Sequence, residues 1–462
     1  MENVEPSKTP AWCPGTGGDG RAAPKGGIGG DDGQHTIANL NWTKAQPRRY
    51  PLMKYVTLAL YEAAGKVIEN RGSAGVDGIT VDELIELLDT HGTGICRKLE
   101  TGTYIPAPVR RVDIPKPNGG TRMLGIPTVL DRTIQQAIVV VIESEFEKQF
   151  SDHSYGFRKG RSAHQAVEEA QKYVKQGYRW VVEIDLSKFF DRVNHDKLMS
   201  IIARVIDDKP MLKLIRRYLT AGIMEGGLVS QRVKGVPQGS PLSPLLSNIM
   251  LTELDRELEK RGLHFCRYAD DCNIYVKSEL AAKRVLASVT RYLEEVLKLQ
   301  VNRDKSGTFR PKDSVFLGYS MTNGGARIEV AQKAIDRLWI KIRKILNQSR
   351  GTSLEQCIQR LSKTLRGWRN YYYLDRRKGF FEKMDIHIRR HLRKLQWIAW
   401  KRPKTREREL KRRGIDPYTA WKSSVNGRGA WWNANAIHMR NAFPISFFRE
   451  NELYSLATMA IV

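Results

Sequence analysis

Three aspartates are the residues whose type and setting indicate chemistry in this sequence. Asp185 ends a short apolar run at 180–184 that is typical of a β-strand, and Asp270 and Asp271 lie between two β-rich runs within 265–276. Phosphoryl transfer uses two divalent ions, roughly 3.5–4 Å apart, that clamp the attacking and leaving oxygens. Carboxylates from adjacent strands could hold these ions, because Mg²⁺ takes oxygen ligands and leaves room for substrate phosphates. The pattern predicts such a site, although an isolated pair of aspartates is more often a plain acidic turn.

The segments around the aspartates predict an α+β core. Apolar residues recur with helical spacing over 58–68, 81–88, 134–146 and 163–174, whereas 104–123 holds short β-rich runs punctuated by prolines and an Asn-Gly-Gly turn. That last segment is typical of an antiparallel ribbon, here carrying basic side chains. Helices interleaved with hairpins are typical of the α+β class.

The charge of the chain predicts an acidic partner. Its 462 residues include 77 Lys or Arg and 50 Asp or Glu, a net charge of +27. Such an excess favours nucleic acid, because each cation that meets a phosphate releases counterions. The alternative is a merely soluble basic protein or a ribosomal one.

The segment 361–415 concentrates this charge. It holds nineteen Lys or Arg against five acids, interleaved with aromatic residues: Trp368, Tyr371, Tyr372, Tyr373, Phe380, Phe381, Trp397 and Trp400. A charge run alone is usually a solvated face. The interleaved rings favour a nucleic-acid surface, since base stacking and phosphate contact need both chemistries.

Composition argues against several classes of protein. The five cysteines are scattered and never spaced as C-x-x-C, which disfavours a disulfide framework and a zinc site. No apolar run approaches the roughly 18 residues of a membrane span, so we expect a cytoplasmic protein without a membrane partner. Residues 1–45 are rich in Gly and Pro and are interpreted as a mobile leader. The G-x-G-x-x-G spacing of Gly15, Gly17 and Gly20 lacks the flanking strand and helix of a dinucleotide site.

The chain resembles the reverse transcriptases encoded by group II introns. The tetrapeptide at 268–271 (YADD) resembles the catalytic signature of reverse transcriptases, and 70–78 (NRGSAGVDG) is similar to a block that this lineage has and retroviral enzymes lack. The other blocks follow in the expected order: 154–162 (SYGFRKGRS), 184–195 (IDLSKFFDRVNH), 236–245 (VPQGSPLSPL), 305–306 (KS) and 316–319 (FLGY). The resemblance runs from about Arg71 to the C-terminus.

The resemblance implies a right-hand polymerase with fingers, palm and thumb. Near the C-terminus, 365–372 (LRGWRNYY) resembles the maturase domain and 426–432 (NGRGAWW) the DNA-binding tail of the family. The expected parts are a mobile leader at 1–45, a helical N-terminal extension at 46–100, fingers and palm at 101–325, a helical thumb or maturase domain at 326–415, and a DNA-binding tail at 416–462.

The resemblance also implies the metal site. Asp185, Asp270 and the backbone carbonyl of Ile184 or its neighbour are expected to bind two Mg²⁺ ions. Asp271 completes the acidic tip and contributes less directly. All three aspartates are therefore expected to be catalytic.

Four further residues match nucleotide-binding positions of the family. Lys116 and Arg122 resemble the fingers residues that close over the triphosphate, with exposed ribbon charges as the alternative. Gln238 matches the position that contacts the incoming nucleotide, or only holds its loop. Phe190 matches the steric gate that excludes a ribose 2′-hydroxyl and so selects a dNTP. A core aromatic is the alternative for Phe190, and is what we expect of Phe189.

The implied function is an RNA-directed DNA polymerase that extends a DNA primer on an RNA template. Such a protein binds its group II intron RNA to promote splicing and supports mobility by target-primed reverse transcription at a target DNA. No cysteine follows Cys357, so we expect this chain to lack the Cys- and His-containing endonuclease of the best-known members.

Two alternatives remain from the sequence. One is a splicing maturase without polymerase activity, against which the three aspartates argue. The other is a domesticated relative in DNA repair or antiviral defence, which the sequence leaves open.

Overall fold

The computed structural model describes residues 51–115, 121–225, 228–230, 234–349 and 351–458. The predicted leader at 1–45 and the predicted site residue Lys116 lie outside the described residues, and the side chain of Arg122 is not described. All described residues belong to one unit of the chain, 49–462.

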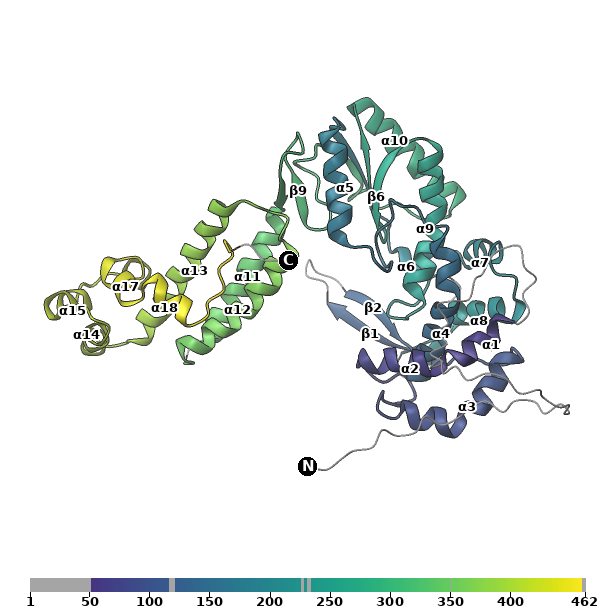
Figure 1. Ribbon diagram of the computed structural model, residues 1–462, viewed down its shortest axis with the longest axis horizontal. Coiled ribbons are helices and arrows are strands. Elements are labelled where there is room, and N and C mark those ends of the chain that lie inside the picture. Colours follow the sequence, from purple (N-terminus) through teal and green to yellow (C-terminus); the bar gives the residue numbers. More distant parts are fainter. Residues whose placement is uncertain (1–50, 116–120, 226–227, 231–233, 350, 459–462) are drawn as a thin grey trace, which may run out of the picture. The chain divides into compact units, whose positions relative to one another are not determined.

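Three helices open the described chain (Figure 1): α1 (Leu52–Leu58), α2 (Leu60–Glu69) and α3 (Leu84–Glu100). The helical pattern predicted for 58–68 is confirmed, with a break at Ala59 between α1 and α2. The helix predicted at 81–88 begins later and runs further, as α3. Helix α4 (Val129–Glu147) packs against both α1 and α2.

The basic ribbon predicted at 104–123 forms two antiparallel strands, β1 (Val109–Pro115) and β2 (Thr121–Ile126). Strand β4 (Ile223–Glu225) adds to β1 in parallel, and β5 (Leu228–Ser230) pairs with β4, so the order is β2-β1-β4-β5. The sequence pattern did not indicate β4 and β5, because three-residue strands show almost no periodicity.

A second sheet carries the aspartates. Its strands are β3 (Trp180–Ile184), β6 (His264–Tyr268), β7 (Asp271–Val276) and β8 (Gly307–Phe309), in the order β6-β7-β3-β8 with every neighbour antiparallel. The predicted strand and hairpin are therefore confirmed. Helices α5 (Ala163–Lys175) and α10 (Glu279–Arg291) pack against this sheet (Figure 1).

The elements around the two sheets complete the right-hand polymerase fold. Helix α9 (Ser243–Lys260) follows the Pro-Gln-Gly block and packs against β6. The remaining elements are α6 (Phe189–Arg192), α7 (His195–Ala203), α8 (Lys209–Thr220), the π-helical turn Tyr292–Val296, β9 (Tyr319–Met321) and β10 (Ile328–Val330).

Beyond β10 every described element is a helix, as the sequence predicted. These are α11 (Gln332–Gln348), α12 (Leu354–Tyr371), α13 (Lys378–Ala399), α14 (Pro403–Arg412), α15 (Pro417–Ser424), α16 (Ala430–Asn433), α17 (Ile437–Ala442) and α18 (Ile445–Glu450). One hydrophobic cluster joins Leu361 and Leu392 to Phe443, Phe448 and Leu456. The predicted thumb and tail thus share a core.

The prediction that the rings of 361–415 form a stacking surface is wrong for three of them. Phe381, Trp397 and Trp400 are buried. Arginines stack on them from within the protein, with the Arg406 guanidinium 4.6 Å from the centre of the Trp397 ring. Helical spacing shows that residues share a face, but not whether core or solvent covers that face.

Truncating the tail core is predicted to destabilise the helical region. Phe448→Ala removes a ring that is 2% exposed, which costs about 3–5 kcal/mol of unfolding free energy. Ile445→Ala on the same helix, at a 60% exposed position, should cost less than about 0.5 kcal/mol. Denaturant unfolding followed by circular dichroism measures both. Equal stability of the two variants would show that α18 is not part of the core.

No helix among the described residues is both long and apolar enough to span a bilayer.

Candidate active site

A groove of about 1220 Å³ collects most of the predicted site residues. Asp185, Asp270, Asp271, Phe190 and Gln238 all line it. They come from three separate blocks of the sequence, 184–195, 236–245 and 268–271, so only the fold brings them together. The groove also takes side chains from β1 and β2, which places the ribbon beside the aspartates.

Asp185 is held by the segment that precedes β8. The Asn302 amide nitrogen Nδ2 donates to the Asp185 carboxylate at 2.9 Å, and the Asn302 backbone N–H donates to the Asp185 carbonyl at 2.8 Å. The Asp185 N–H donates to Ser306 Oγ at 2.9 Å, and the Lys305 ammonium lies 3.8 Å from the carboxylate. These contacts fix the carboxylate in one direction while leaving it open to the groove.

Asp270 lies in a tight hairpin turn. Tyr268 pairs with Asp271 across β6 and β7, so Ala269 and Asp270 alone form the loop. Ala269 has φ +57, a left-handed conformation that costs a residue with a side chain about 1–2 kcal/mol. Two-residue hairpins favour Gly or Asn at such positions, so the surroundings must stabilise this turn.

The carboxylates are close enough to repel one another. The pKa of Asp271 is raised to about 6, first by partial burial between the groove walls and then by the negative charges of Asp270 and Asp185. Lys305 acts in the opposite direction. A bound cation would relieve this repulsion, which suits the site to a divalent metal.

The described residues hold no group of three His, Cys, Asp or Glu side chains that forms a metal cage by itself. Mg²⁺ in phosphoryl-transfer sites uses one or two carboxylates, with water and substrate phosphates as the other ligands. Asp185 and Asp270 fit that requirement. The predicted carbonyl ligand belongs to Ile184 or to a neighbouring residue. Ile184 is 2% exposed and pairs with Cys272 inside the sheet, whereas Leu186, on the other side of Asp185, lines the groove.

Phe189 and Phe190 lie in different surroundings. Phe189 is 3% exposed and belongs to the core, while Phe190 is half-buried and lines the groove, with the two ring centroids 5.2 Å apart. The Val236 N–H donates to the Phe190 carbonyl. A Cβ on Gly235 would lie 2.7 Å from that same carbonyl oxygen. The Phe190 backbone is therefore pinned to the loop that carries Gln238.

Gln238 is placed by its main chain. Its carbonyl accepts a hydrogen bond from Gly125 N–H at 2.9 Å, which ties the loop to β2. Ser243 Oγ donates to the Pro237 carbonyl at 2.6 Å. The half-buried Gln238 side chain faces the groove from a loop that is fixed on both sides.

Of the two cations predicted for the fingers, Lys116 and Arg122, the structure describes only the backbone of Arg122. The Arg122 backbone pairs with Ile114 in the ribbon, and its neighbours Thr121 and Met123 line the groove. The roles predicted for Lys116 and Arg122 stay predictions. Arg111 and Arg132 also line the groove, but Arg111 is paired with Glu225 at 2.7 Å and Arg132 donates to the Ser73 carbonyl at 2.7 Å.

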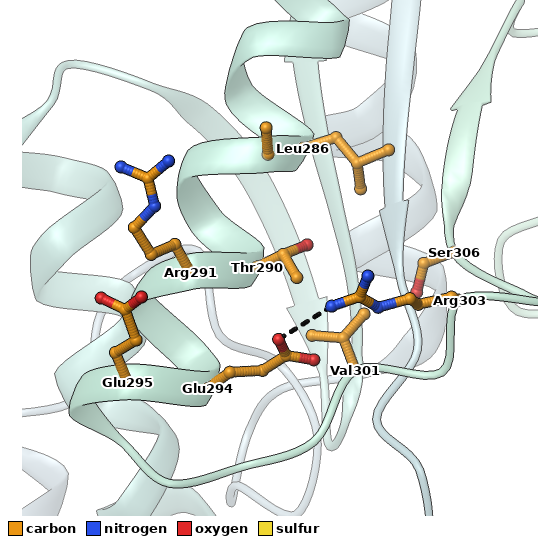
Figure 2. A pocket seen from close by; sticks show the side chains of 9 residues that line it. Leu286, Thr290, Arg291, Glu294, Glu295, Val301, Arg303 and Ser306 are labelled. Atoms are coloured by element: carbon orange, nitrogen blue, oxygen red, sulfur yellow. Dashed lines mark hydrogen bonds and ion pairs between the residues drawn. The ribbon is translucent and has the colours of Figure 1, made fainter.

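A second pocket, of about 510 Å³, lies against α10 and the π-helical turn (Figure 2). Glu294 and Arg303 form an ion pair at 3.1 Å in its wall. Val301 and Ser306 line this pocket, whereas Asn302 and Lys305 line the catalytic groove. The segment that holds Asp185 thus contributes to both hollows.

Two family models match the chain. Residues 114–321 match "Reverse transcriptase (RNA-dependent DNA polymerase)", and residues 335–414 match "Group II intron, maturase-specific domain". Protein YkfC of Escherichia coli is 34% identical over 337 residues, which are 64% of this chain and 88% of YkfC. The group II intron-encoded protein LtrA of Lactococcus lactis is 39% identical over 208 residues, 45% of this chain and 34% of LtrA.

The putative COX1/OXI3 intron 1 protein of Saccharomyces cerevisiae is 31% identical over 287 residues, 60% of this chain and 33% of that protein. This chain belongs to the reverse transcriptases of the group II intron type. The matched reverse transcriptase region contains Asp185, Asp270 and Asp271. The maturase match covers α12, α13, α14 and most of α11. The chain spans about a third of the length of LtrA and of the yeast protein.

Reverse transcriptases depend on divalent metal ions, which agrees with the acidic groove. In this protein, the sequence indicated the aspartates but not the residues that form hydrogen bonds with Asp185. Asn302 was not singled out, and the Lys305-Ser306 pair was noted only as part of the family pattern. Their hydrogen bonds to Asp185 span 117 and 121 residues of sequence, a separation that no local pattern reveals.

Proposed function

We propose that this reverse transcriptase extends a DNA primer on an RNA template, binds a group II intron RNA to promote its splicing, and supports intron mobility by target-primed reverse transcription in the cytoplasm. The observation that carries the polymerase activity is the convergence of Asp185, Asp270, Asp271, Phe190 and Gln238 on one groove. The match to the maturase-specific domain supports the splicing role.

The proposed chemistry follows from the groove. Asp185 and Asp270, with a backbone carbonyl of Ile184 or Leu186, would hold two Mg²⁺ ions, and Asp271 would add negative charge beside them. These ions would favour the primer 3′-alkoxide and stabilise the charge that develops on the leaving pyrophosphate. Gln238 would contact the incoming dNTP, and the Phe190 ring would exclude a 2′-hydroxyl. Lys116 and Arg122 would neutralise the triphosphate.

The exposed rings of the tail support a target DNA as partner. Tyr418, Trp421 and Trp432 are 67%, 52% and 46% exposed. Lys422 lies over the Tyr418 ring, and the Arg428 guanidinium is 4.5 Å from the centre of the Trp432 ring. Exposed rings beside cations are suited to bases and phosphates. These rings of α15 and α16 are more accessible for stacking than the buried Phe381, Trp397 and Trp400 of the segment 361–415.

Removing a tail ring is predicted to weaken DNA binding without affecting catalysis. Trp421→Ala should lower the affinity for a single-stranded DNA oligonucleotide by about 10- to 100-fold, because stacking contributes about 1–3 kcal/mol per base. Trp421→Phe should retain most of it. Fluorescence anisotropy at fixed salt measures both. Unchanged affinity in the alanine variant would exclude this ring from the DNA surface.

The RNA that co-purifies with the protein tests whether an intron RNA is its partner. Purification of the full chain from cells that hold its gene, followed by sequencing of the bound RNA, should recover a structured intron that surrounds this gene. Added protein should then promote splicing of that intron in vitro. Recovery of unrelated RNAs, or an intron that splices equally well without the protein, would contradict the splicing role and favour the domesticated alternative.

A further inference from the structure

Behind the catalytic turn lies a buried arginine. Arg267 of β6 is fully buried, and its guanidinium Nε and Nη2 donate to both carboxylate oxygens of Asp255 at 2.7 and 2.6 Å. Asp255 lies on α9 and is also fully buried. The remaining nitrogen, Nη1, donates to the Ala269 carbonyl at 2.9 Å and to Asn248 Oδ1 at 3.1 Å. The guanidinium therefore links α9 to the loop that contains Asp270.

A second support reaches the turn from the block at 154–162. Asn248 Nδ2 donates to the Gly156 carbonyl at 2.8 Å, and the Tyr155 N–H donates to the Arg267 carbonyl at 2.8 Å. A Cβ on Gly156 would lie 2.3 Å from the backbone nitrogen of Ala269. The atom in the way is a backbone nitrogen, so no flexible side chain could move to make room for a Cβ. Gly156 and Arg267 thus enclose the turn from two directions.

The nature of the ion pair indicates why it is there. A fully buried ion pair adds little net stability, because desolvation of both charges offsets their attraction, and apolar residues of similar size often replace such a pair without loss. Its value lies in geometry. The planar guanidinium has a fixed fork that can bind one carboxylate twice and still aim a third nitrogen elsewhere, which a lysine cannot do.

We propose that Arg267, oriented by Asp255 and Asn248 of α9, is a positioning residue for catalysis. The bond to the Ala269 carbonyl fixes the Ala269–Asp270 peptide in its left-handed turn, and so sets where the Asp270 carboxylate meets the metal and the primer end. This inference rests on the proposed polymerase function and adds the means by which Asp270 is held.

The test compares Arg267→Lys and Asn248→Ala with the wild-type full chain. Single-nucleotide incorporation on an RNA template with a DNA primer gives kcat and the KM for dNTP. Both variants should lose about 10- to 100-fold in kcat, since a misplacement of about 1 Å at a reacting group has that effect. The KM for dNTP should stay within about threefold, because Gln238 and Phe190 are untouched. Binding of Mn²⁺ alone, followed by electron paramagnetic resonance, should weaken in both variants.

Leu258→Ala is the matched control. Leu258 is fully buried one turn beyond Asp255 on the same helix and makes no hydrogen bond through its side chain. It should lower Tm at least as much as Asn248→Ala, with kcat within about threefold of wild type. If Arg267→Lys does not fold, Asn248→Ala alone decides. Variants that match Leu258→Ala in kcat and bind Mn²⁺ like wild type would overturn the inference. An inactive wild type would instead contradict the proposed function.

Discussion

Asp270→Asn should abolish DNA synthesis while the protein stays folded and binds intron RNA as before. The substitution keeps the size of the side chain and removes a negative charge from the acidic cluster. Loss of a metal ligand removes several kcal/mol of transition-state stabilisation, so incorporation should fall by about a thousandfold or more. Primer extension measures the activity, and filter binding measures the RNA affinity.

The fold makes this separation of activities reasonable. Asp270 is in the turn between β6 and β7, whereas the maturase-specific match begins at residue 335. Relief of the repulsion that raises the pKa of Asp271 should leave the metal-free variant at least as stable as wild type. Asp313→Asn, an exposed aspartate outside the groove lining, is the control and should retain full activity. Joint loss of synthesis and RNA binding would show that the turn has a structural role instead.

Phe190→Val should relax the choice between deoxyribonucleotides and ribonucleotides. The half-buried ring faces the groove, and the hydrogen bond from Val236 fixes the backbone that carries it, so the chain cannot shift to make room for a larger sugar. Forcing a 2′-hydroxyl against a fixed ring costs about 1–3 kcal/mol, which corresponds to roughly 10- to 100-fold in discrimination. The ratio of kcat/KM for dNTP and rNTP, measured on the same template, should fall by that factor.

Phe189→Leu tests whether the choice of sugar depends on the Phe190 ring alone or on the packing of the neighbouring core. Its ring is 3% exposed and packs edge to face on Phe190, so the change should lower stability and leave the sugar ratio within about threefold. If Phe189→Leu alters the ratio as much as Phe190→Val does, the choice of sugar depends on general packing around α6. Unchanged discrimination in Phe190→Val would remove the ring from the role of gate.

The acidic elements could be predicted from the sequence because their signals are local. The strand is predicted by an apolar run that ends at Asp185, and the hairpin by two β-rich runs around 268–271. Neither prediction needs information from the rest of the chain. The long helices followed from spacing in the same way. Three-residue strands such as β4 carry too little pattern, and the break at Ala59 divides a helical pattern that is continuous in the sequence.

The supports of the site could not be predicted, for a different physical reason. Asn302, Arg267 and Asn248 are ordinary polar residues until the fold places them against Asp185 or the Ala269 carbonyl. Buried polar groups take whichever partner the tertiary structure offers. The rings of Trp397 and Trp400 illustrate the opposite error, because aromatic residues next to arginines occur in cores as well as on nucleic-acid surfaces.

The central claim is that the groove of the three aspartates polymerises DNA on RNA. Its most direct test is single-turnover primer extension with purified protein, an RNA template annealed to a DNA primer, dNTPs and Mg²⁺. We expect incorporation that continues along the template and stops when the metal is chelated. Tight binding of the template and primer, with no incorporation in either Mg²⁺ or Mn²⁺, would contradict the claim and leave a protein that only binds RNA.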